Sequence, residues 1–541
     1  MKKRLLAHMN KGHAAILLIA SCAWLPTPLT AQPVPASSTA DVAGSAASTL
    51  PLLGDGSAMG SADERRLGDR IARELFRDPD YLDDPVLADY VQGVWQPLLA
   101  AARLRGELTP EIDERFAWQI MLGRDRTVNA FALPGGYLGV NLGLMAVVSS
   151  RDELASVLGH ELSHVTQRHI SRLIAKESAQ TPWMIGAMIL GALAASKNVD
   201  AGSALMVGGQ AVAAQSQLNF SRDMEREADR IGFGVMTQAG FKGQSFVTMF
   251  DKLQQAARLN DAGAYPYLRT HPLTTERIAD MESRLPLGAP HPLAGTPTML
   301  HAMMSTRAKV LSNTGVDALR IWQAQANDPD LQSLPVAQQA GIWYGAALAA
   351  SSLREVALAR QDLARLQTLA APDPSAAAPV RWLGAEIDLA ARDLSPAQLT
   401  NLAARLGITG AQEVRLADLR RPELMLQAQV ALQLNQASLL NTVGQSLQSW
   451  LVNQPHDALA WQTLGSLYSA QNQSLRALRA QAEAQAAQLD YTGAVDRLRA
   501  AQDLMRANEA AGSAADHIDA SIIDTRQREL QALLKQQALN R

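Results

Sequence analysis

The sequence predicts an α+β chain that is mainly α-helical, with a small β-sheet inside residues 61–293 and an all-α helical-repeat domain in residues 298–541. Two stretches dense in β-forming residues, 116–122 and 128–141, lie between segments of helical periodicity and predict the sheet. From about Thr298 the composition shifts to Ala, Leu and Gln in successive helical segments, which predicts repeats. A length of 541 residues, 47% hydrophobic and 19% charged, fits two or three globular domains.

The N-terminus has the plan of a secretory signal. Four basic residues precede an apolar run over residues 14–24, and a Pro/Thr-rich stretch ends at Ala31. We therefore expect residues 1–31 to be a signal peptide and the chain to be exported. Residues 1–31 hold four Lys or Arg and no acid, so cleavage would lower the formal charge by four, from −3 to −7. A strongly acidic product argues against nucleic acid as a partner.

The chain has one cysteine, Cys22, which lies inside the predicted signal. Cleavage after Ala31 would leave no thiol, so disulfides are excluded and any metal must use His, Asp or Glu. An alternative is that Ile-Ala-Ser-Cys at 19–22 is a lipobox, in which Cys22 would be acylated and anchor the protein. Both interpretations predict an exported chain.

Residues 32–60 are rich in Pro, Ala, Ser, Thr and Gly and predict a flexible linker, with folded structure from about Ser61. Helices are predicted over 63–76, 85–103 and 150–176, the last capped by Ser149 or Ser150. Pro134-Gly135-Gly136 should break the second β-forming stretch. An apolar pair, 182–195 and 201–215, is too short to span a membrane. It predicts a buried hairpin or flap over the site, with membrane contact as the alternative.

The stretch VLGHELSHV at 157–165 places two histidines four residues apart on the predicted helix. A helix advances about 100° per residue, so His160 and His164 project from nearly the same face and can converge on one ion. Glu161 then points towards whatever the ion holds. This arrangement suits metal-assisted hydrolysis, with two imidazole ligands and a carboxylate free to take a proton from water.

A third protein ligand is expected from SRDMEREADRIGF at 221–233, because a hydrolytic zinc site uses three. Glu225 and Asp229 are four residues apart on a second predicted helix and share a face. Glu225 would bind the metal, and Asp229 would accept a hydrogen bond from a ligand imidazole. The alternative is a solvated acidic face, formed by both residues with Glu227 and balanced by neighbouring arginines.

Four stretches in order resemble the M48 family of zinc metallopeptidases: NAFALPGGYLGVNLGLM at 129–145, DELASVLGHELSHV at 152–165, SRDMEREAD at 221–229 and THPLTTERI at 270–278. The resemblance implies a zincin-like metallopeptidase domain over 61–293 with one Zn²⁺ per chain. It also implies that His160, His164 and Glu225 are zinc ligands, that Glu161 is the catalytic base and that Asp229 supports the ligands.

Three further parts of the site are predicted around these residues. If residues 129–137 form a sheet edge, Asn129, Ala130 and Phe131 would bind an extended substrate through main-chain hydrogen bonds. Phe131 as a core residue is the alternative. His271 precedes a proline and would cap the zinc as a fourth ligand or switch, bind the transition state, or be structural. Oxyanion donors are sought among Tyr265, Tyr267 and Arg222, whereas His169, nine residues beyond His160, is expected to lie too far to reach the ion.

The stretch WQTLGSLY at 461–468 has the spacing of a tetratricopeptide first helix, and Ala477 and Ala484 follow where its second helix needs small residues. Residues 298–541 are therefore predicted as a degenerate tetratricopeptide-like domain, with a plain helical bundle as the alternative. We expect a periplasmic zinc endopeptidase, with chaperone activity as an additional role, that acts on unfolded or misassembled polypeptides. Its repeats would dock to outer-membrane protein assembly machinery. The competing hypothesis is a repeat-based chaperone or scaffold with a mostly latent metal site.

Overall fold

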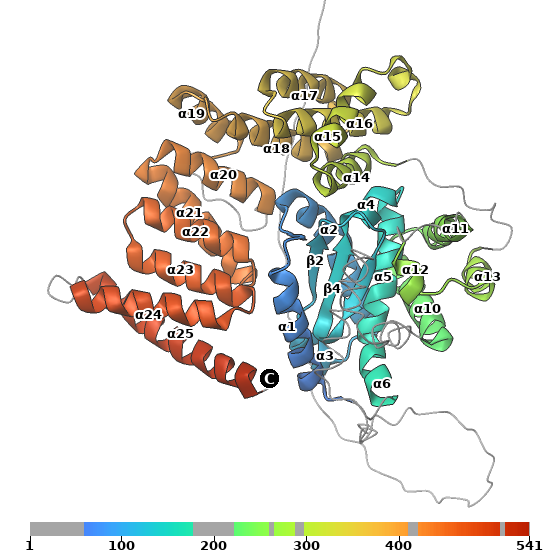
Figure 1. The fold of residues 1–541 in the computed structure, drawn as a ribbon, viewed down its shortest axis with the longest axis horizontal. Helices are drawn as coiled ribbons and strands as arrows, with labels where there is room; N and C mark the ends of the chain where they lie inside the picture. The colour runs from blue at the N-terminus through green and yellow to red at the C-terminus, as the bar shows by residue number, and fades with distance from the viewer. Residues whose placement is uncertain are drawn as a thin grey trace, which may run out of the picture. The chain divides into compact units, whose positions relative to one another are not determined.

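The computed structural model describes residues 59–176, 221–258, 265–286, 297–408, 420–508 and 514–539 (Figure 1). These residues belong to one compact unit, which spans Gly54–Arg541. The predicted signal peptide, nearly all of the linker and the apolar pair at 182–215 lie outside the described residues. Among the helices that are described, none is long and apolar enough to cross a bilayer.

The predicted sheet is present and has four strands in the order β1-β2-β4-β3. Its strands are β1 (Tyr81–Leu82), β2 (Gln119–Gly123), β3 (Ala130–Leu133) and β4 (Tyr137–Asn141). β2 pairs with β4 in parallel, whereas β1 with β2 and β3 with β4 are antiparallel. β3 is therefore an edge strand whose outer main-chain groups face away from β4.

The break between β3 and β4 is the predicted Pro-Gly-Gly turn, a 3₁₀ turn η1 (Pro134–Gly136). Gly135 and Gly136 have φ of 72° and 87°, a left-handed backbone that favours glycine. A Cβ on Gly135 would lie 2.7 Å from Cα of Arg65, so this turn also sits tightly on the first helix. The glycines thus fix where the edge strand ends.

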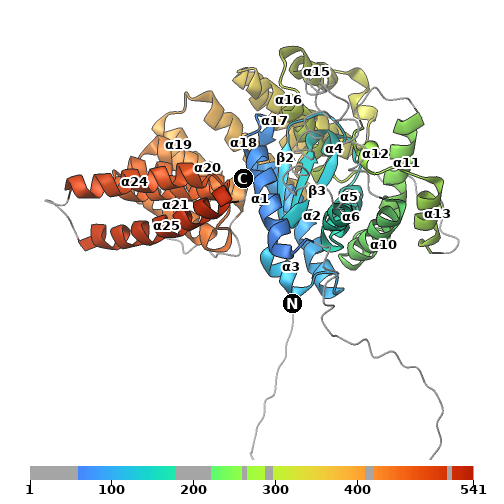
Figure 2. The same cartoon turned by 60° about the horizontal axis from the view of Figure 1, so that its bottom comes forward.

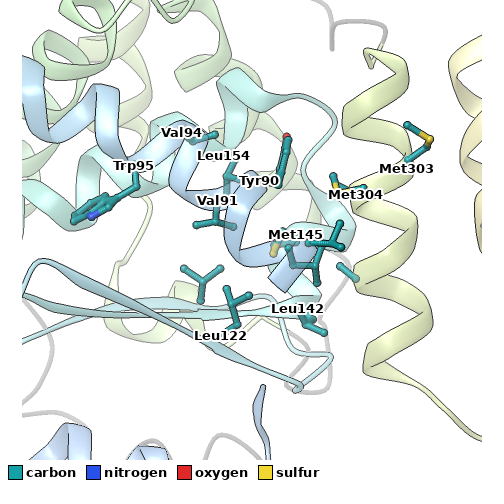
Figure 3. Close-up of a cluster of buried hydrophobic side chains, with 14 of the residues drawn as sticks. Tyr90, Val91, Val94, Trp95, Leu122, Leu142, Met145, Leu154, Met303 and Met304 are labelled. Atoms are coloured by element: carbon teal, nitrogen blue, oxygen red, sulfur yellow. The ribbon is translucent and has the colours of Figure 1, made fainter. Parts of the chain in front are cut away.

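The sheet is accompanied by helices that hold most of the catalytic motifs. They are α1 (Ser61–Phe76), α2 (Pro85–Leu104), α3 (Pro110–Arg115), α4 (Leu142–Val147), α5 (Arg151–Thr166), α6 (His169–Lys176), α10 (Arg222–Gln238), α11 (Gln244–Arg258), α12 (Tyr267–Thr270) and α13 (Thr275–Ser283). α5 packs against α2, α10, α11 and β3, so it is central, as Figures 1 and 2 show. In Figure 3, Val91 and Trp95 of α2 lie with Leu122 and Leu154 in the buried core.

The single helix predicted over 150–176 is wrong, because it breaks after Thr166. Of the two predicted caps, Ser149 and Ser150, the structure shows Ser150, since its side chain accepts from the Glu153 amide. Arg168 has φ of 53°, which ends α5 and lets α6 begin at His169 in a new direction. Its guanidinium Nε lies 2.8 Å from the buried Glu64 carboxylate of α1, and this ion pair holds the break.

Beyond residue 297 the described chain is helical throughout. It contains α14 (Met299–Ser312), α15 (Val316–Ala326), η2 (Pro329–Ser333), α16 (Val336–Ser352), α17 (Val356–Ala370), α18 (Pro374–Ala391), α19 (Pro396–Arg405), α20 (Arg421–Leu434), α21 (Ala437–Asn453), α22 (Ala458–Ala470), α23 (Ser474–Ala487), α24 (Tyr491–Asn508) and α25 (Ala514–Leu539). α22 packs on α23, and a Cβ on Gly465 would lie 3.4 Å from the Ala477 carbonyl oxygen. A Cβ at this distance would make ordinary van der Waals contact, so the packing is compatible with the small residues but does not require glycine here.

Ion pairs tie these later helices to the segment around β1 and α2. Arg307 of α14 is 4% exposed and donates to Asp84, at 2.7 Å, and to Glu386 of α18. Arg421 of α20 donates to Asp83 at 2.6 Å. The charge of a buried guanidinium is compensated when two carboxylates contact it, so Arg307 holds α14 beside α2.

Candidate metal centre and active site

Helix α5 brings the two motif histidines together in the interior. Nε2 of His160 and Nε2 of His164 lie 3.0 Å apart, and the two side chains are 2% and 1% exposed. Burial, reinforced by His160 and His271, holds the pKa of His164 well below its ordinary value, so its imidazole is neutral. A neutral imidazole is the form that binds a metal.

Helix α10 approaches α5 through two glycines. A Cβ on Gly232 would lie 2.9 Å from the His160 amide nitrogen, and one on Gly159 would lie 3.2 Å from the Gly232 oxygen. Contacts this short leave no room for a side chain between the two helices. The pair therefore sets the distance at which α10 presents its acidic residues to the histidines.

The acids of α10 face inward, as the i, i+4 spacing predicted. Glu225 Oε1 lies 3.4 Å from His164 Nε2, and Asp229 Oδ1 lies 2.9 Å from His160 Nδ1. Both acids are 1% exposed, so the alternative of a solvated acidic face is wrong for them. Burial raises the pKa of each carboxyl, but His271 acting on Glu225 and Arg277 acting on Asp229 leave both pKa values below the ordinary range.

His271 lies at the end of α12 and completes the cluster. Its Nδ1 is 3.0 Å from Glu225 Oε1, and its ring stacks on Tyr267 with centroids 4.6 Å apart. Burial lowers the pKa of His271, yet Glu225 and Glu161 together raise it above its usual value. One ligand atom from each of His160, His164, Glu225 and His271 lies within 4.8 Å of the other three.

Glu161 lies beside this cluster and is fully buried. Its Oε2 accepts a hydrogen bond of 2.9 Å from the Ala132 amide of β3, while Oε1 has no hydrogen-bond partner among the described residues. Burial raises the pKa of Glu161 against the opposing effects of His271 and His160. One carboxylate oxygen is thus held by the edge strand, and the other faces His271, whose Nε2 lies 3.5 Å away.

The donor set fits a divalent metal ion. Three buried carboxylates, Glu161, Glu225 and Asp229, are accompanied by one buried guanidinium, that of Arg277. These four groups alone carry a formal charge of −2, which is costly in a buried site unless a cation compensates it. Two or three imidazoles and a carboxylate are also typical zinc donors.

Comparison with known proteins agrees with this geometry. The model of peptidase family M48 matches residues 90–285. The beta-barrel assembly-enhancing protease of Escherichia coli is 30% identical over 456 residues, which cover 81% of this chain and 83% of that protein. This chain belongs to peptidase family M48. It is a metalloendopeptidase, and like other M48 enzymes it is metal-dependent.

Two other M48 relatives are similar over shorter spans. A Vibrio cholerae protein named for the same activity is 32% identical over 322 residues, 59% of this chain and 63% of that relative. The mitochondrial metalloendopeptidase OMA1 of Arabidopsis thaliana is 32% identical over 205 residues, 38% of this chain and 36% of its own length. The Vibrio cholerae alignment thus covers just under two thirds of that relative.

Arg277 is a site residue of this M48 enzyme that the sequence reasoning missed. Its guanidinium donates to both oxygens of Asp229, at 2.6 and 2.8 Å, and lies 2.7 Å from Glu225 Oε2. It also donates to the Pro272 carbonyl at 2.8 Å. Burial lowers the pKa of Arg277, but Asp229 and Glu225 raise that pKa by more than burial lowers it, so the guanidinium stays charged. Its place within THPLTTERI was the only available signal.

The predicted oxyanion candidates separate in the structure. Tyr267 is fully enclosed beside the cluster, and burial together with Glu161 and Glu225 raises the pKa of its hydroxyl well above the ordinary value. Tyr265 is half-buried, and Arg222 is exposed on the first turn of α10. Tyr267 is therefore the candidate that the fold brings to the M48 site.

The sheet edge predicted for residues 129–137 is β3. The Asn129 carbonyl accepts from the amide of Asn141, which belongs to β4. Because main-chain groups alternate in direction along an antiparallel strand, those of Phe131 also point towards β4, and those of Ala130 point away from it. On that outer side Ala132 donates to Glu161, and Val128 accepts from the Tyr267 amide at 3.4 Å. The Phe131 ring lies over Gly139, where a Cβ would be 2.1 Å away, so its side chain packs on the sheet. Both interpretations of Phe131 are compatible.

Proposed function

We propose that this chain is a zinc-dependent endopeptidase of the periplasm that cleaves unfolded or misassembled envelope polypeptides. The observation that carries the proposal is the buried cluster of His160, His164 and Glu225 beside Glu161, whose Oε1 accepts no hydrogen bond from the described residues. The E. coli relative is named for enhancing β-barrel assembly and is similar over most of both chains. That similarity favours outer-membrane proteins as substrates.

His160, His164 and Glu225 would hold one zinc ion. When bound, zinc acts as a Lewis acid that activates a water molecule near neutral pH and polarises a peptide carbonyl. Glu161 Oε1 accepts the proton of the attacking water and later donates it to the leaving peptide nitrogen. The Ala132 amide fixes Glu161 during both transfers, and Asp229 with Arg277 orients His160.

The outer edge of β3 would bind the substrate. An extended peptide that adds to this edge would bond to the outward-facing main-chain groups of Ala130, with Asn129 and Phe131 on either side. Because such contacts use the main chain, they select unfolded chains over folded ones. The Tyr267 hydroxyl is our candidate for stabilising the negative charge that develops on the substrate carbonyl.

His271 would act as a fourth ligand or switch. A hydrolytic site needs one position open for water, so a fourth protein ligand makes the enzyme latent until its loop withdraws. The position of His271, 3.0 Å from Glu225, supports this role, but transition-state binding remains the competing role. The same observation favours the second candidate function, a chaperone or scaffold with a mostly latent metal site.

Outside the metal site, the proposal assigns docking to assembly machinery to the tetratricopeptide-like helices of residues 298–541. The 456-residue alignment with the E. coli relative is longer than residues 61–293 and so supports a shared architecture beyond the protease region. Export by a signal at 1–31, or anchoring through Cys22, is part of the same proposal. The intact mass of the mature protein distinguishes cleavage after Ala31 from acylation.

The test is metal analysis of the purified protein combined with cleavage of unfolded casein. We expect about one zinc per chain and cleavage that a chelator abolishes. Glu161→Gln should keep zinc and lose activity by about 10²-fold or more, because it removes proton transfer and leaves coordination intact. Wild-type turnover by Glu161→Gln would refute the mechanism, and binding of unfolded chains without any cleavage would favour the chaperone.

A further inference from the structure

The imidazole of His169, which lies outside the cluster, contacts His164 on the side away from it. Nε2 of His164 faces His160 and Glu225, whereas its Nδ1 lies 2.9 Å from Nδ1 of His169. Nε2 of His169 lies in turn 3.0 Å from Glu227 Oε2, and Arg172 donates to the same oxygen at 2.8 Å. His169 is 0% exposed. These contacts form a chain that runs from a surface ion pair to a ligand imidazole.

The break between α5 and α6 creates the contact. On a straight helix, a residue five positions after His164 would point about 140° away from it. The left-handed backbone at Arg168, with φ of 53°, turns the chain so that the His169 ring meets the His164 ring edge-on, with centroids 4.9 Å apart. A non-glycine residue in this conformation persists only when surrounding contacts hold it, here the ion pair with Glu64.

The acceptor at the end of the chain fixes every proton in it. An ionised carboxylate only accepts, so Nε2 of His169 must carry the proton that Glu227 receives. Nδ1 of a neutral His169 is then an acceptor, and it takes the proton on Nδ1 of His164. His164 consequently keeps its proton on Nδ1 and presents the unprotonated Nε2 towards the cluster. No other arrangement of neutral tautomers satisfies both contacts.

We propose that His169 is a positioning residue that holds His164 in the tautomer and orientation required for metal binding. The inference rests on the proposed function, since it takes His164 to be a metal ligand. With this role for His169, each of the two motif histidines is oriented by an acidic residue that is itself paired with an arginine. His160 is held by Asp229, which pairs with Arg277, and His164 is held through His169 by Glu227, which pairs with Arg172.

The test measures zinc affinity in the full chain by competition with a chromogenic chelator. His169→Leu removes the acceptor, and we expect the zinc Kd to rise by about 10- to 100-fold, as for other groups that orient ligand imidazoles. His169→Gln keeps an amide oxygen for His164 and an amide donor for Glu227, so it should restore affinity to within about threefold of wild type.

The matched control is His301→Leu. His301 is also 2% exposed and bonded through both ring nitrogens, to the Tyr90 hydroxyl and the Val148 carbonyl. Its loss should lower the melting temperature of the metal-free protein and leave the zinc Kd unchanged. If His169→Leu does not fold, Glu227→Ala carries the test, because it removes the same support from another helix and should weaken zinc about tenfold.

The outcomes separate the two proposals. A wild-type chain that binds no zinc refutes the proposed function. Tight zinc binding by the wild type with unchanged affinity in folded His169→Leu, or in Glu227→Ala, refutes the positioning role alone. Equal weakening in His169→Leu and His301→Leu would also refute it, since it would show only a general loss of packing.

Discussion

Replacing Gly232 with alanine should damage the metal site from outside it. Gly232 is where α10 touches α5, and an added Cβ would lie 2.9 Å from the His160 amide nitrogen and 3.0 Å from Gly159. Ordinary contact begins at 3.4 Å, and the opposing atoms are helix backbone that cannot rotate away. The two helices must therefore separate by about 0.5 Å.

The effect follows from the rigidity of α10. Glu225 lies two turns before Gly232, so it should move with the helix, away from His160 and His164. Ligands and reacting groups tolerate only about 0.5 Å of displacement, so we expect a loss of about tenfold or more in zinc affinity and cleavage. Overpacking costs about 1–3 kcal/mol, and the better helix propensity of alanine offsets up to about 1 kcal/mol of this.

The assay compares three alanine variants for zinc Kd, casein cleavage and chemical denaturation. Gly159→Ala makes a milder contact of 3.2 Å and should lie between wild type and Gly232→Ala. Gly234→Ala, on the same helix, meets only the mobile guanidinium of Arg105 and should match wild type or gain stability. If Gly232→Ala binds zinc and cleaves casein like Gly234→Ala, the glycine contact does not set the site geometry.

Glu225→Ala should release zinc, because two imidazoles hold it poorly, and stoichiometric zinc by elemental analysis would contradict this. His271→Ala should raise basal casein cleavage at unchanged zinc content if it caps the metal, whereas a sharp fall would indicate transition-state binding. Arg307→Met should lower the unfolding free energy by about 3–5 kcal/mol by stranding buried carboxylates, against about 1 kcal/mol or less for exposed Arg320→Met. Burial raises the pKa of Asp457, but Arg421 lowers it below the ordinary value, so its stabilisation is full above about pH 4 and lost as pH falls further. Denaturation of wild type and Asp457→Asn should therefore converge as the pH falls below about 4, and a constant difference would refute the shift.

Much of this architecture could be predicted because it depends on local sequence. The i, i+4 spacing put His160 with His164, and Glu225 with Asp229, on single helix faces whatever the tertiary packing. Proline and glycine placed the turn between β3 and β4. The helical spacing alone did not predict that α5 and α10 pack together. That contact was expected only because a hydrolytic zinc site needs a third protein ligand.

The residues that were missed depend on tertiary contacts. Arg277 reaches Asp229 across 48 positions of sequence, and no periodicity connects α13 with α10. The expectation that His169 lies too far from the ion assumes a continuous helix, and the left-handed residue that ends the helix is Arg168, a residue type with no turn preference. What decided the break was an ion pair with Glu64, from a helix about a hundred residues earlier in the chain.

Arg277 also explains why three neighbouring carboxylates take different roles. It pairs with Glu225 and Asp229, which therefore stay ionised and suit metal binding and support of His160. Glu161 has the Ala132 amide on one oxygen and His271 Nε2 at 3.5 Å from the other, so an imidazole, and not Arg277, faces that oxygen. The shifts agree, since the pKa of Glu161 is raised by burial while those of Glu225 and Asp229 are lowered. Carboxylates whose environments separate their proton affinities in this way are suited to separate roles, and Glu161 is the one that can both accept and return a proton.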